Sequence, residues 1–216
     1  LTNQRVVFVL SELQTEWSIV AAHSRYHVLR NNFVSAIDVG QVSFASDGQI
    51  CTTTISIDAL EDIVAQCESH LSNSRDDKLR ALANAGSSFI RIRNAMIDFD
   101  WEQTMEVLGA YIETQQQHGR NVELHISDES VVQALTREID VVKRAIDVGL
   151  ASDSLLKCIQ EESICGVPGG LSCAKLDLQA LEESLDDTQK LIQRNPSTWL
   201  ESLIVAGTCI LKVRRA

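Results

Sequence analysis

The amino-acid sequence predicts an all-α fold of about eight or nine helices. Three observations support this prediction: the 216 residues include only two prolines, apolar residues recur at steps of three and four, and short segments resemble one another along the chain. Proline breaks helices, whereas steps of three and four place apolar side chains on one stripe of a helix. We therefore expect helices that pack in pairs to bury these stripes.

Internal similarity indicates that the helices form degenerate helix-pair repeats. The sequence Ala-Ile-Asp-Val-Gly at 36–40 recurs letter for letter at 145–149, and a second short pattern follows each copy at a variable distance. Such repeats stack because none can bury its apolar face alone. The sequence thus predicts a single helical domain over 1–216, with units at approximately 13–72, 76–140 and 141–213.

Three apolar stripes share one register and define the helices of these units. Steps of three and four are kept throughout, which is the spacing of one helix face. The stripes consist of Ile57, Leu60, Val64, Cys67 and Leu71; of Val132, Leu135, Ile139, Val142 and Ile146; and of Leu178, Leu181, Leu185 and Ile192, with Thr188 as a polar exception.

Helix ends are predicted from glycine and from capping residues. Gly40 and Gly149 are expected to end helices, since glycine adopts the left-handed conformation of many helix C-termini. The Ser-Asp pairs at 46–47 and 152–153 are then expected to cap the next helix. Further starts are predicted at 76–77, 98–100, 127–128 and 195–197, where Asp, Ser or Asn precedes an apolar periodic segment.

Two segments do not fit this helical pattern. Residues 42–56 contain an Asp-Gly pair between partly alternating residues, which is a hairpin signal, although the parallel with 151–153 favours a short capped helix. A small hairpin there stays an alternative. Residues 165–172, rich in glycine with Pro168, are predicted to form a loop.

Composition is that of an ordinary soluble globular protein, with 44% hydrophobic and 23% charged residues. The net charge of −11 disfavours a phosphate backbone or an anionic membrane surface as the main partner. We expect a basic or neutral protein partner instead, and no direct contact with nucleic acid. The basic residues Lys212, Arg214 and Arg215 suit the C-terminal end of a helix dipole. No apolar run is long enough for a membrane span.

The six cysteines occur at irregular spacings, which is typical of reduced cysteines in an intracellular protein. We therefore expect a cytoplasmic or cytoskeletal location. The chain begins with Leu1 and has no visible secretory signal. We accordingly expect a processed form or a piece of a larger protein.

Metal-binding patterns are weak in this sequence. His23 and His27 lie four residues apart on an expected helix, so both imidazoles are able to face one ion. No third ligand is evident, and Arg25 between them opposes a cation, which favours a solvated histidine pair. Cys158, Cys165 and Cys173 lack the short spacing of a zinc knuckle and are interpreted as incidental thiols.

Catalytic motifs are also missing. The Gly-Val-Pro-Gly-Gly segment at 166–170 lacks the Gly-Lys-Ser/Thr ending of a phosphate-binding loop. The acidic pairs at 61–62, 161–162 and 186–187 are interpreted as solvated helix faces. No Gly-x-Ser-x-Gly elbow is present. The sequence therefore assigns no catalytic, cofactor-binding or metal-binding residue, and no cofactor.

The three tryptophans are candidates for packing or for a partner anchor. Trp17, Trp101 and Trp199 fall near expected helix starts or on apolar faces, where most tryptophans pack inside a protein. An exposed one at the end of the array would be a candidate anchor for a partner. The last helix, at 199–215, has an apolar face and a basic end, which suits a calmodulin-like groove less well than capping of the array.

The function that these patterns favour is a helical-repeat scaffold or protein–protein interaction segment, within a larger cytoskeletal or multi-subunit assembly. This prediction rests on analogy between folds. The alternative is an all-α enzyme or small-ligand-binding protein whose site no motif reveals. A helical transcription regulator ranks last, because no basic helix-turn-helix is present and the charge has the wrong sign.

Overall fold

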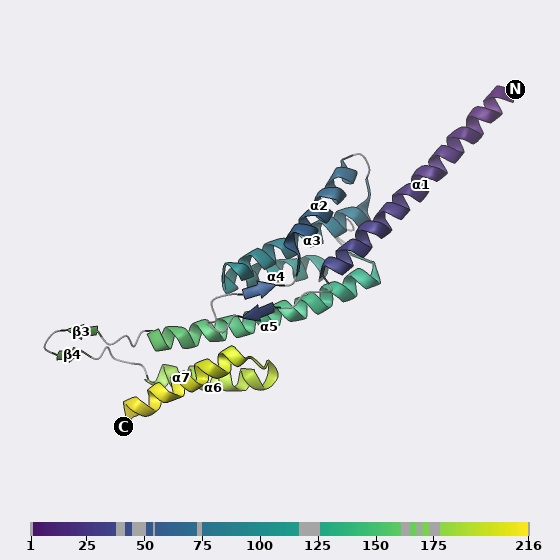
Figure 1. Cartoon of the computed structure of the whole chain (residues 1–216). Helices are drawn as coiled ribbons and strands as arrows, with labels where there is room; N and C mark the ends of the chain where they lie inside the picture. Colours follow the sequence, from purple (N-terminus) through teal and green to yellow (C-terminus); the bar gives the residue numbers. More distant parts are fainter. Residues whose placement is uncertain are drawn as a thin grey trace. The chain divides into compact units, whose positions relative to one another are not determined.

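The computed structural model describes residues 2–37, 42–44, 51–53, 55–72, 75–116, 126–160, 165–167, 170–172 and 178–215. In these ranges the protein is all-α, with two very short hairpins (Figure 1). The helices are α1 (Thr2–Ile37), α2 (Ile57–Leu71), α3 (Asp77–Ile97), α4 (Trp101–Gln116), α5 (Glu129–Gln160), α6 (Leu178–Arg194) and α7 (Thr198–Arg215). Seven helices thus occur in the described ranges, and the prediction of eight or nine is wrong there.

Four predicted helix starts are confirmed, each with the expected capping side chain. The carboxylate of Asp76, Asp100 or Asp128, or the hydroxyl of Ser197, accepts a backbone N–H of the first turn of α3, α4, α5 and α7. The acceptor distances run from 2.9 Å for Asp100 to 3.4 Å for Ser197. These side chains replace partners that the first helical N–H groups lack.

The predicted helix end at Gly149 is wrong. Gly149, Ser152 and Asp153 all lie inside α5, which runs without a break from Glu129–Gln160. The glycine is needed for space rather than for a turn: a Cβ atom on Gly149 would lie 2.2 Å from Cε2 of Trp101. Because the indole of Trp101 packs directly on the backbone of α5, only glycine fits at this position.

Helix α3 ends just before Phe99, a residue type that does not predict a helix end. Phe99 has a φ of 58°, in the left-handed region that usually takes glycine. The N–H of Asp100 donates to the carbonyl of Ala95, and the N–H of Phe99 donates to that of Met96. These two bonds form a Schellman motif. The ring of Phe99 also packs edge-on to Trp101, with centroids 6.3 Å apart.

Strands occur where a short helix and a loop were expected. Strand β1 (Val42–Phe44) pairs antiparallel with β2 (Cys51–Thr53), with Ser43 opposite Thr52. The hairpin alternative therefore describes this segment, and the favoured capped helix is wrong. Strand β3 (Cys165–Val167) pairs antiparallel with β4 (Gly170–Ser172), so the glycine-rich loop of the prediction is also a small hairpin.

The helices divide into two compact units whose boundaries fall inside α3, α4 and α5. Unit 1 comprises Leu1–Gly40, Ile55–Arg91 and Val107–Glu138. Its core holds Phe33 of α1, Leu60 and Cys67 of α2, and Phe89 of α3, each of which is 0% exposed. Phe89 meets Tyr111 of α4 edge-on at 5.2 Å between centroids.

Unit 2 comprises Gln41–Thr54, Ile92–Glu106 and Ile139–Ala216. Helices α6 and α7 lie along the second half of α5, and the three helices share one apolar core. Thr188, the polar exception of the third stripe, is buried there, but its hydroxyl donates to the carbonyl of Ser184 at 2.7 Å. The core consists of Val148, Leu155, Leu181, Leu185, Leu200 and Leu203.

The described residues of the two identical pentapeptides have different places in their helices. Ala36 and Ile37 are the last residues of α1, whereas Ala145 to Gly149 lie in the interior of α5. Residues 38–41 lie outside the described residues, and so do Ser46 and Asp47, the predicted cap that follows. Ile37 and Ile146, the matching isoleucines, are both buried. The division into repeat units at 13–72, 76–140 and 141–213 stays a prediction.

Candidate interaction surface

Helix α1 has a packed half and an exposed half. Its last turns are buried in unit 1 through Tyr26, Leu29, Phe33 and Ile37. Between Phe8 and Arg25, by contrast, every described side chain is exposed except the half-buried Ala21. Figure 1 shows this half of α1 extending away from α2 and from the packed turns. The helix thus continues well past the point where its own unit covers it.

Large apolar side chains are concentrated on the exposed half. Leu10, Leu13, Trp17 and Val20 are 59%, 60%, 74% and 59% exposed. Their spacing of three, four and three residues places them on one face, which we call the α1 stripe. Phe8 and Ile19, at 61% and 63% exposed, lie on the opposite face. The exposed half of α1 therefore carries apolar side chains on two opposite faces, so its apolar and polar residues are not separated as in an ordinary amphipathic helix.

Exposed apolar residues elsewhere are scattered. Of the thirteen exposed large apolar side chains in the described ranges, seven lie on α1, and they include the only exposed tryptophan of those ranges, Trp17. Isolated exposed residues such as Val205 on α7 are ordinary, whereas a contiguous patch marks an interaction site. The α1 stripe is accordingly the candidate functional surface of the described chain.

A polar cluster fixes α1 where its packed half begins. Arg30 forms an ion pair with Asp128 at the start of α5, with 2.8 Å between Nε and Oδ2, and also donates to the hydroxyl of Ser130. The hydroxyl of Tyr26 donates to Asp128 at 3.3 Å. Lys78 of α3 lies over the ring of Tyr26, 5.6 Å from its centroid. The cluster ties α1 to α3 and α5.

The cluster changes the acidity of two of its members. Burial raises the pKa of Tyr26 to about 12, with a further contribution from the charge of Asp128. Burial alone would raise the pKa of Asp128, but hydrogen bonds from Ser130 and Arg30, the charge of Arg30 and the Val131 N–H hold it below its usual range. Asp128 therefore stays ionised to lower pH in the folded state than in the unfolded chain.

We predict that the charge of Asp128 stabilises the fold at neutral pH. Asp128→Asn keeps a capping oxygen and loses the charge, so it should lower the free energy of unfolding by about 0.5–1 kcal/mol at pH 7. Asp128→Ala loses both and should lower it by about 1–2 kcal/mol. A carboxyl with a lowered folded-state pKa contributes above its unfolded pKa of about 3.9 and stops contributing as pH falls through the folded value.

Urea unfolding of the wild type and both variants between pH 7 and pH 2.5 measures this effect. The difference between the wild type and Asp128→Asn should shrink below about pH 4, because the wild type then loses the same charge. A difference that is independent of pH would contradict the assigned role.

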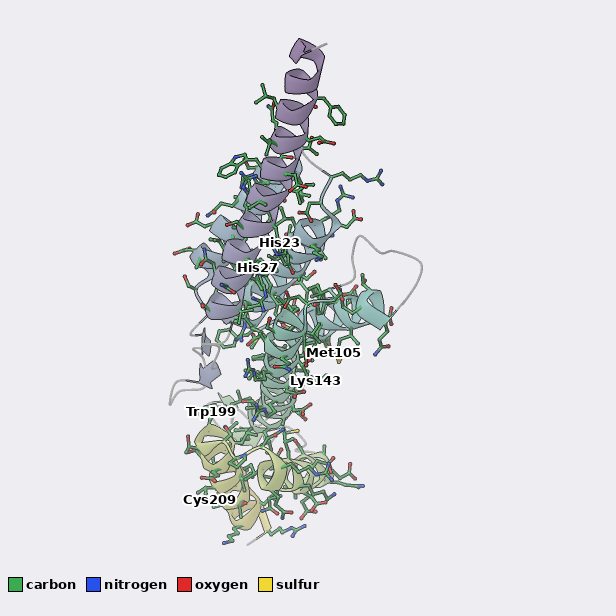
Figure 2. The ribbon with its side chains drawn as sticks, turned by 90° about the vertical axis from the view of Figure 1, so that its right-hand side faces the viewer. His23, His27, Met105, Lys143, Trp199 and Cys209 are labelled. Atoms are coloured by element: carbon green, nitrogen blue, oxygen red, sulfur yellow. The ribbon has the colours of Figure 1, made fainter. Side chains whose placement is uncertain are left out.

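His23 and His27 lie one turn apart on α1, on either side of the start of its packed half, and both side chains are exposed (Figure 2). Their Nε2 atoms are 2.9 Å apart and the rings meet edge-on. Among the described residues no group of three or more His, Cys, Asp or Glu side chains is placed to hold a metal ion. The pair forms an imidazole–imidazole hydrogen bond in this structure.

The three cysteines with described side chains are free thiols. Cys67 is buried in the core of unit 1, and burial raises the pKa of its thiol to about 11. Cys158 is half-buried on α5, and Cys209 is exposed on α7. The side chains of Cys165 and Cys173 lie outside the described residues, so the predicted interpretation of 158, 165 and 173 as incidental thiols is not tested.

We predict that thiol labelling discriminates Cys67 from Cys209. The thiolate is the reactive form, and Cys67 is both inaccessible and disfavoured as a thiolate. With iodoacetamide at pH 8, Cys209 should be alkylated in the native protein, and Cys67 only after unfolding. Peptide mass spectrometry at timed intervals gives both rates. Alkylation of Cys67 as fast as that of Cys209 would show that unit 1 lacks the described core.

The other two tryptophans pack inside unit 2. Trp101 is 3% exposed against Gly149, and the half-buried Trp199 donates its Nε1–H to the hydroxyl of Ser152 at 2.6 Å. Neither is available as an anchor. Trp17 alone of the three keeps the exposed position that the anchor hypothesis requires.

The remaining sequence candidates contribute no described site. Asp186 and Asp187 bind Lys190 on the same helix, at 2.6 and 3.2 Å, which supports their interpretation as a solvated face. At the C-terminal end of α7, Arg215 forms an ion pair with Glu182 of α6. Residues 161–162 and 168–169 lie outside the described residues.

A recess lined by Tyr26, Lys78, Leu82 and Ile126 has room for about one water molecule.

Comparison of the chain with protein-family models, with curated proteins and with solved structures finds no match. No helix in the described ranges combines the length and apolar character that crossing a bilayer requires. The surface must therefore be interpreted from its own chemistry.

Proposed function

We propose that this chain is a helical scaffold or protein–protein interaction segment within a larger cytoskeletal or multi-subunit assembly. The observation that carries the proposal is the α1 stripe, in which four large apolar side chains, each at least 59% exposed, follow one face of a helix that the rest of unit 1 leaves uncovered there. Burying an apolar side chain of this size contributes about 1.5–3 kcal/mol, and a partner that covers the stripe would gain this free energy.

Helix stability supports the same proposal. A helix gains most of its stability from packing of an apolar face, and an uncovered helical segment is marginal in water. The segment from Phe8 to Arg25 has two apolar faces and no cover from its own unit. A partner that lies along this segment would therefore stabilise the helix and bury its tryptophan at the same time.

Charge favours a protein as the partner. The chain carries a net charge of −11, and two of its acidic residues, Glu12 and Glu16, lie in the exposed half of α1. Nucleic acids and anionic lipid surfaces are repelled by such a protein. An apolar protein helix with few acidic side chains fits, in an intracellular setting where the cysteines stay reduced.

The test compares substitutions at two exposed positions, where neither change disturbs a core. Trp17→Glu puts a charge into the stripe, and Val205→Glu puts one at an isolated site that is 64% exposed on α7. The full chain and both variants are immobilised, and the bound proteins are quantified by mass spectrometry. Chains that bind the wild type and Val205→Glu should be depleted at least tenfold with Trp17→Glu. Equal depletion by both variants, or nothing above background, would refute the proposal.

A further inference from the structure

The α1 stripe has the spacing of a two-helix seam. Leu10, Leu13, Trp17 and Val20 occupy alternate steps of three and four, which are the a and d positions of a heptad pattern. Gln14 and Ala21 then flank the seam on one side, and Glu16 flanks it on the other. This pattern specifies one long partner helix rather than a pocket for a small ligand.

The stripe is also complementary to itself when reversed. In an antiparallel pair, Leu10 of one copy lies level with Val20 of the other, and Leu13 lies level with Trp17. The same two contacts recur on the other side of the two-fold axis, as an isologous interface requires. All four apolar residues thus meet apolar residues, and each layer combines a larger with a smaller side chain.

We infer that the α1 stripe binds the α1 stripe of a second copy of this chain in an antiparallel helix pair. This inference rests on the proposed function and names the partner of its surface. The two-fold axis crosses the pair at the height of Thr15, between the Leu13 and Trp17 layers.

A parallel pair fits less well. It would set Trp17 against Trp17 and Val20 against Val20, so that the layers would be very unequal in size. In the antiparallel pair, Tyr26, where the packed half of α1 begins, lies level with residue 4 of the second copy. The exposed halves therefore cover each other over residues 8–22, and only the first residues of α1, up to residue 4, lie level with the packed part of the other helix.

The area is sufficient for a weak dimer. Complete burial of an aromatic side chain removes roughly 150–250 Å² from water, and Trp17 is still 74% exposed. With its three aliphatic neighbours, the stripe offers roughly 250–400 Å² on each copy, or about 500–800 Å² for the pair. The flanking side chains raise this toward about 1,000–1,200 Å², the low end of specific interfaces. We therefore expect dissociation constants in the micromolar range.

The flanking charges allow this arrangement. Glu16 of each copy lies near the two-fold axis on the same flank, but both carboxylates face solvent, where repulsion between charges is weak and screened. The other acidic residue of the segment, Glu12, points away from the seam. No charged side chain is buried by the pair.

Analytical ultracentrifugation of the full chain tests the pairing, with two charge substitutions on opposite faces. Trp17→Glu should raise the dissociation constant at least tenfold. Ile19→Glu, at a residue that is 63% exposed on the other face, should leave it within about twofold. At a concentration where the wild type is monomeric, both variants should keep its circular dichroism and thermal unfolding, because neither residue is in the core. A wild-type monomer up to about 100 µM, or equal weakening by both variants, would overturn the inference.

Cross-linking tests the direction of the pair. Gln14 lies beside the seam near the two-fold axis, so Gln14→Cys should form a disulfide-linked dimer under mild oxidation. In a parallel pair the two Gln14 positions would lie on opposite flanks and would not cross-link. Thr15→Cys, on the outer face, is the control and should stay at the wild-type background. No excess of cross-linked dimer with Gln14→Cys would overturn the antiparallel arrangement.

Different results would reject the self-pairing of α1 and the proposed interaction function. A monomeric wild-type chain that still captures other proteins through Trp17 would reject self-pairing and keep the interaction function. A dimer that no substitution in the stripe weakens would reject the stripe itself as the surface.

Discussion

Gly149→Ala is expected to lower the free energy of unfolding by about 2 kcal/mol, against the helix propensities of the two residues. Alanine is favoured over glycine inside a helix by roughly 1 kcal/mol. At this position, however, its Cβ would lie 2.2 Å from Cε2 and 2.3 Å from Cδ2 of the Trp101 indole. A buried bicyclic ring cannot move aside, so α5 must shift away from α4, and overpacking of this kind costs about 1–3 kcal/mol.

Gly109→Ala is the matched control, because Gly109 is also inside a helix and has nothing within 4 Å of a Cβ atom. It should raise stability by about 0.5–1 kcal/mol, so the two glycines respond with opposite signs. Thermal unfolding followed by circular dichroism measures both. In a Trp101→Leu background, Gly149→Ala should lose about half of its cost. Stabilisation by both alanines would show that Trp101 does not pack on α5.

Leu200→Ala is expected to lower the stability of unit 2 by about 2–5 kcal/mol. Leu200 is 0% exposed and lies in the shared core of α5, α6 and α7, beside Leu155 and Leu181. Truncating it removes buried methyl groups and leaves a cavity between three helices, which cannot collapse without moving one of them. Chemical denaturation followed by circular dichroism and by the fluorescence of Trp199, on the same helix, reports the loss.

The control for this core is Val205→Ala on α7, at a side chain that is 64% exposed. Its effect should stay within about 0.5 kcal/mol. If the two substitutions had similar effects, α7 would not be packed on α5 and α6 as described.

The sequence predicts the beginnings of helices better than their ends. Asp76, Asp100, Asp128 and Ser197 cap the helices that they were predicted to cap. This success has a local cause, since an N-cap side chain bonds to N–H groups two or three residues further along. The stripes of α2 and α6 follow from periodicity in the same way, and Leu60, Cys67, Leu181 and Leu185 are all buried.

Three positions depart from what the sequence around them predicts. Gly149 has the sequence context of a C-terminal glycine, but it is needed because Trp101, on another helix, lies against it. Conversely, Phe99 ends α3 in a conformation that a sequence reader assigns to glycine. Arg93 is 0% exposed although an arginine inside a helix is normally assigned to the solvated face. None of these three outcomes can be derived from neighbouring residues.

The sequence predicts only part of the candidate surface. It offers Trp17 as an anchor for a partner if that side chain is exposed, and the structure places it at 74% exposure. The spacing of Leu10, Leu13, Trp17 and Val20 was visible in the sequence, but such spacing normally predicts a buried face. Only the structure shows that the packed stripe of α1 begins at Tyr26 and that this earlier stripe has no cover in its unit.

The central claim is that the exposed half of α1 is a binding surface whose helix is stabilised by a partner. Hydrogen–deuterium exchange of residues 8–25, at protein concentrations from about 1 to 200 µM, tests it most directly. The amides of this segment should become at least tenfold more protected as concentration rises in the wild type and in Ile19→Glu, and should stay unprotected in Trp17→Glu. Rapid exchange at every concentration in all three proteins, or the same protection in all three, would contradict it.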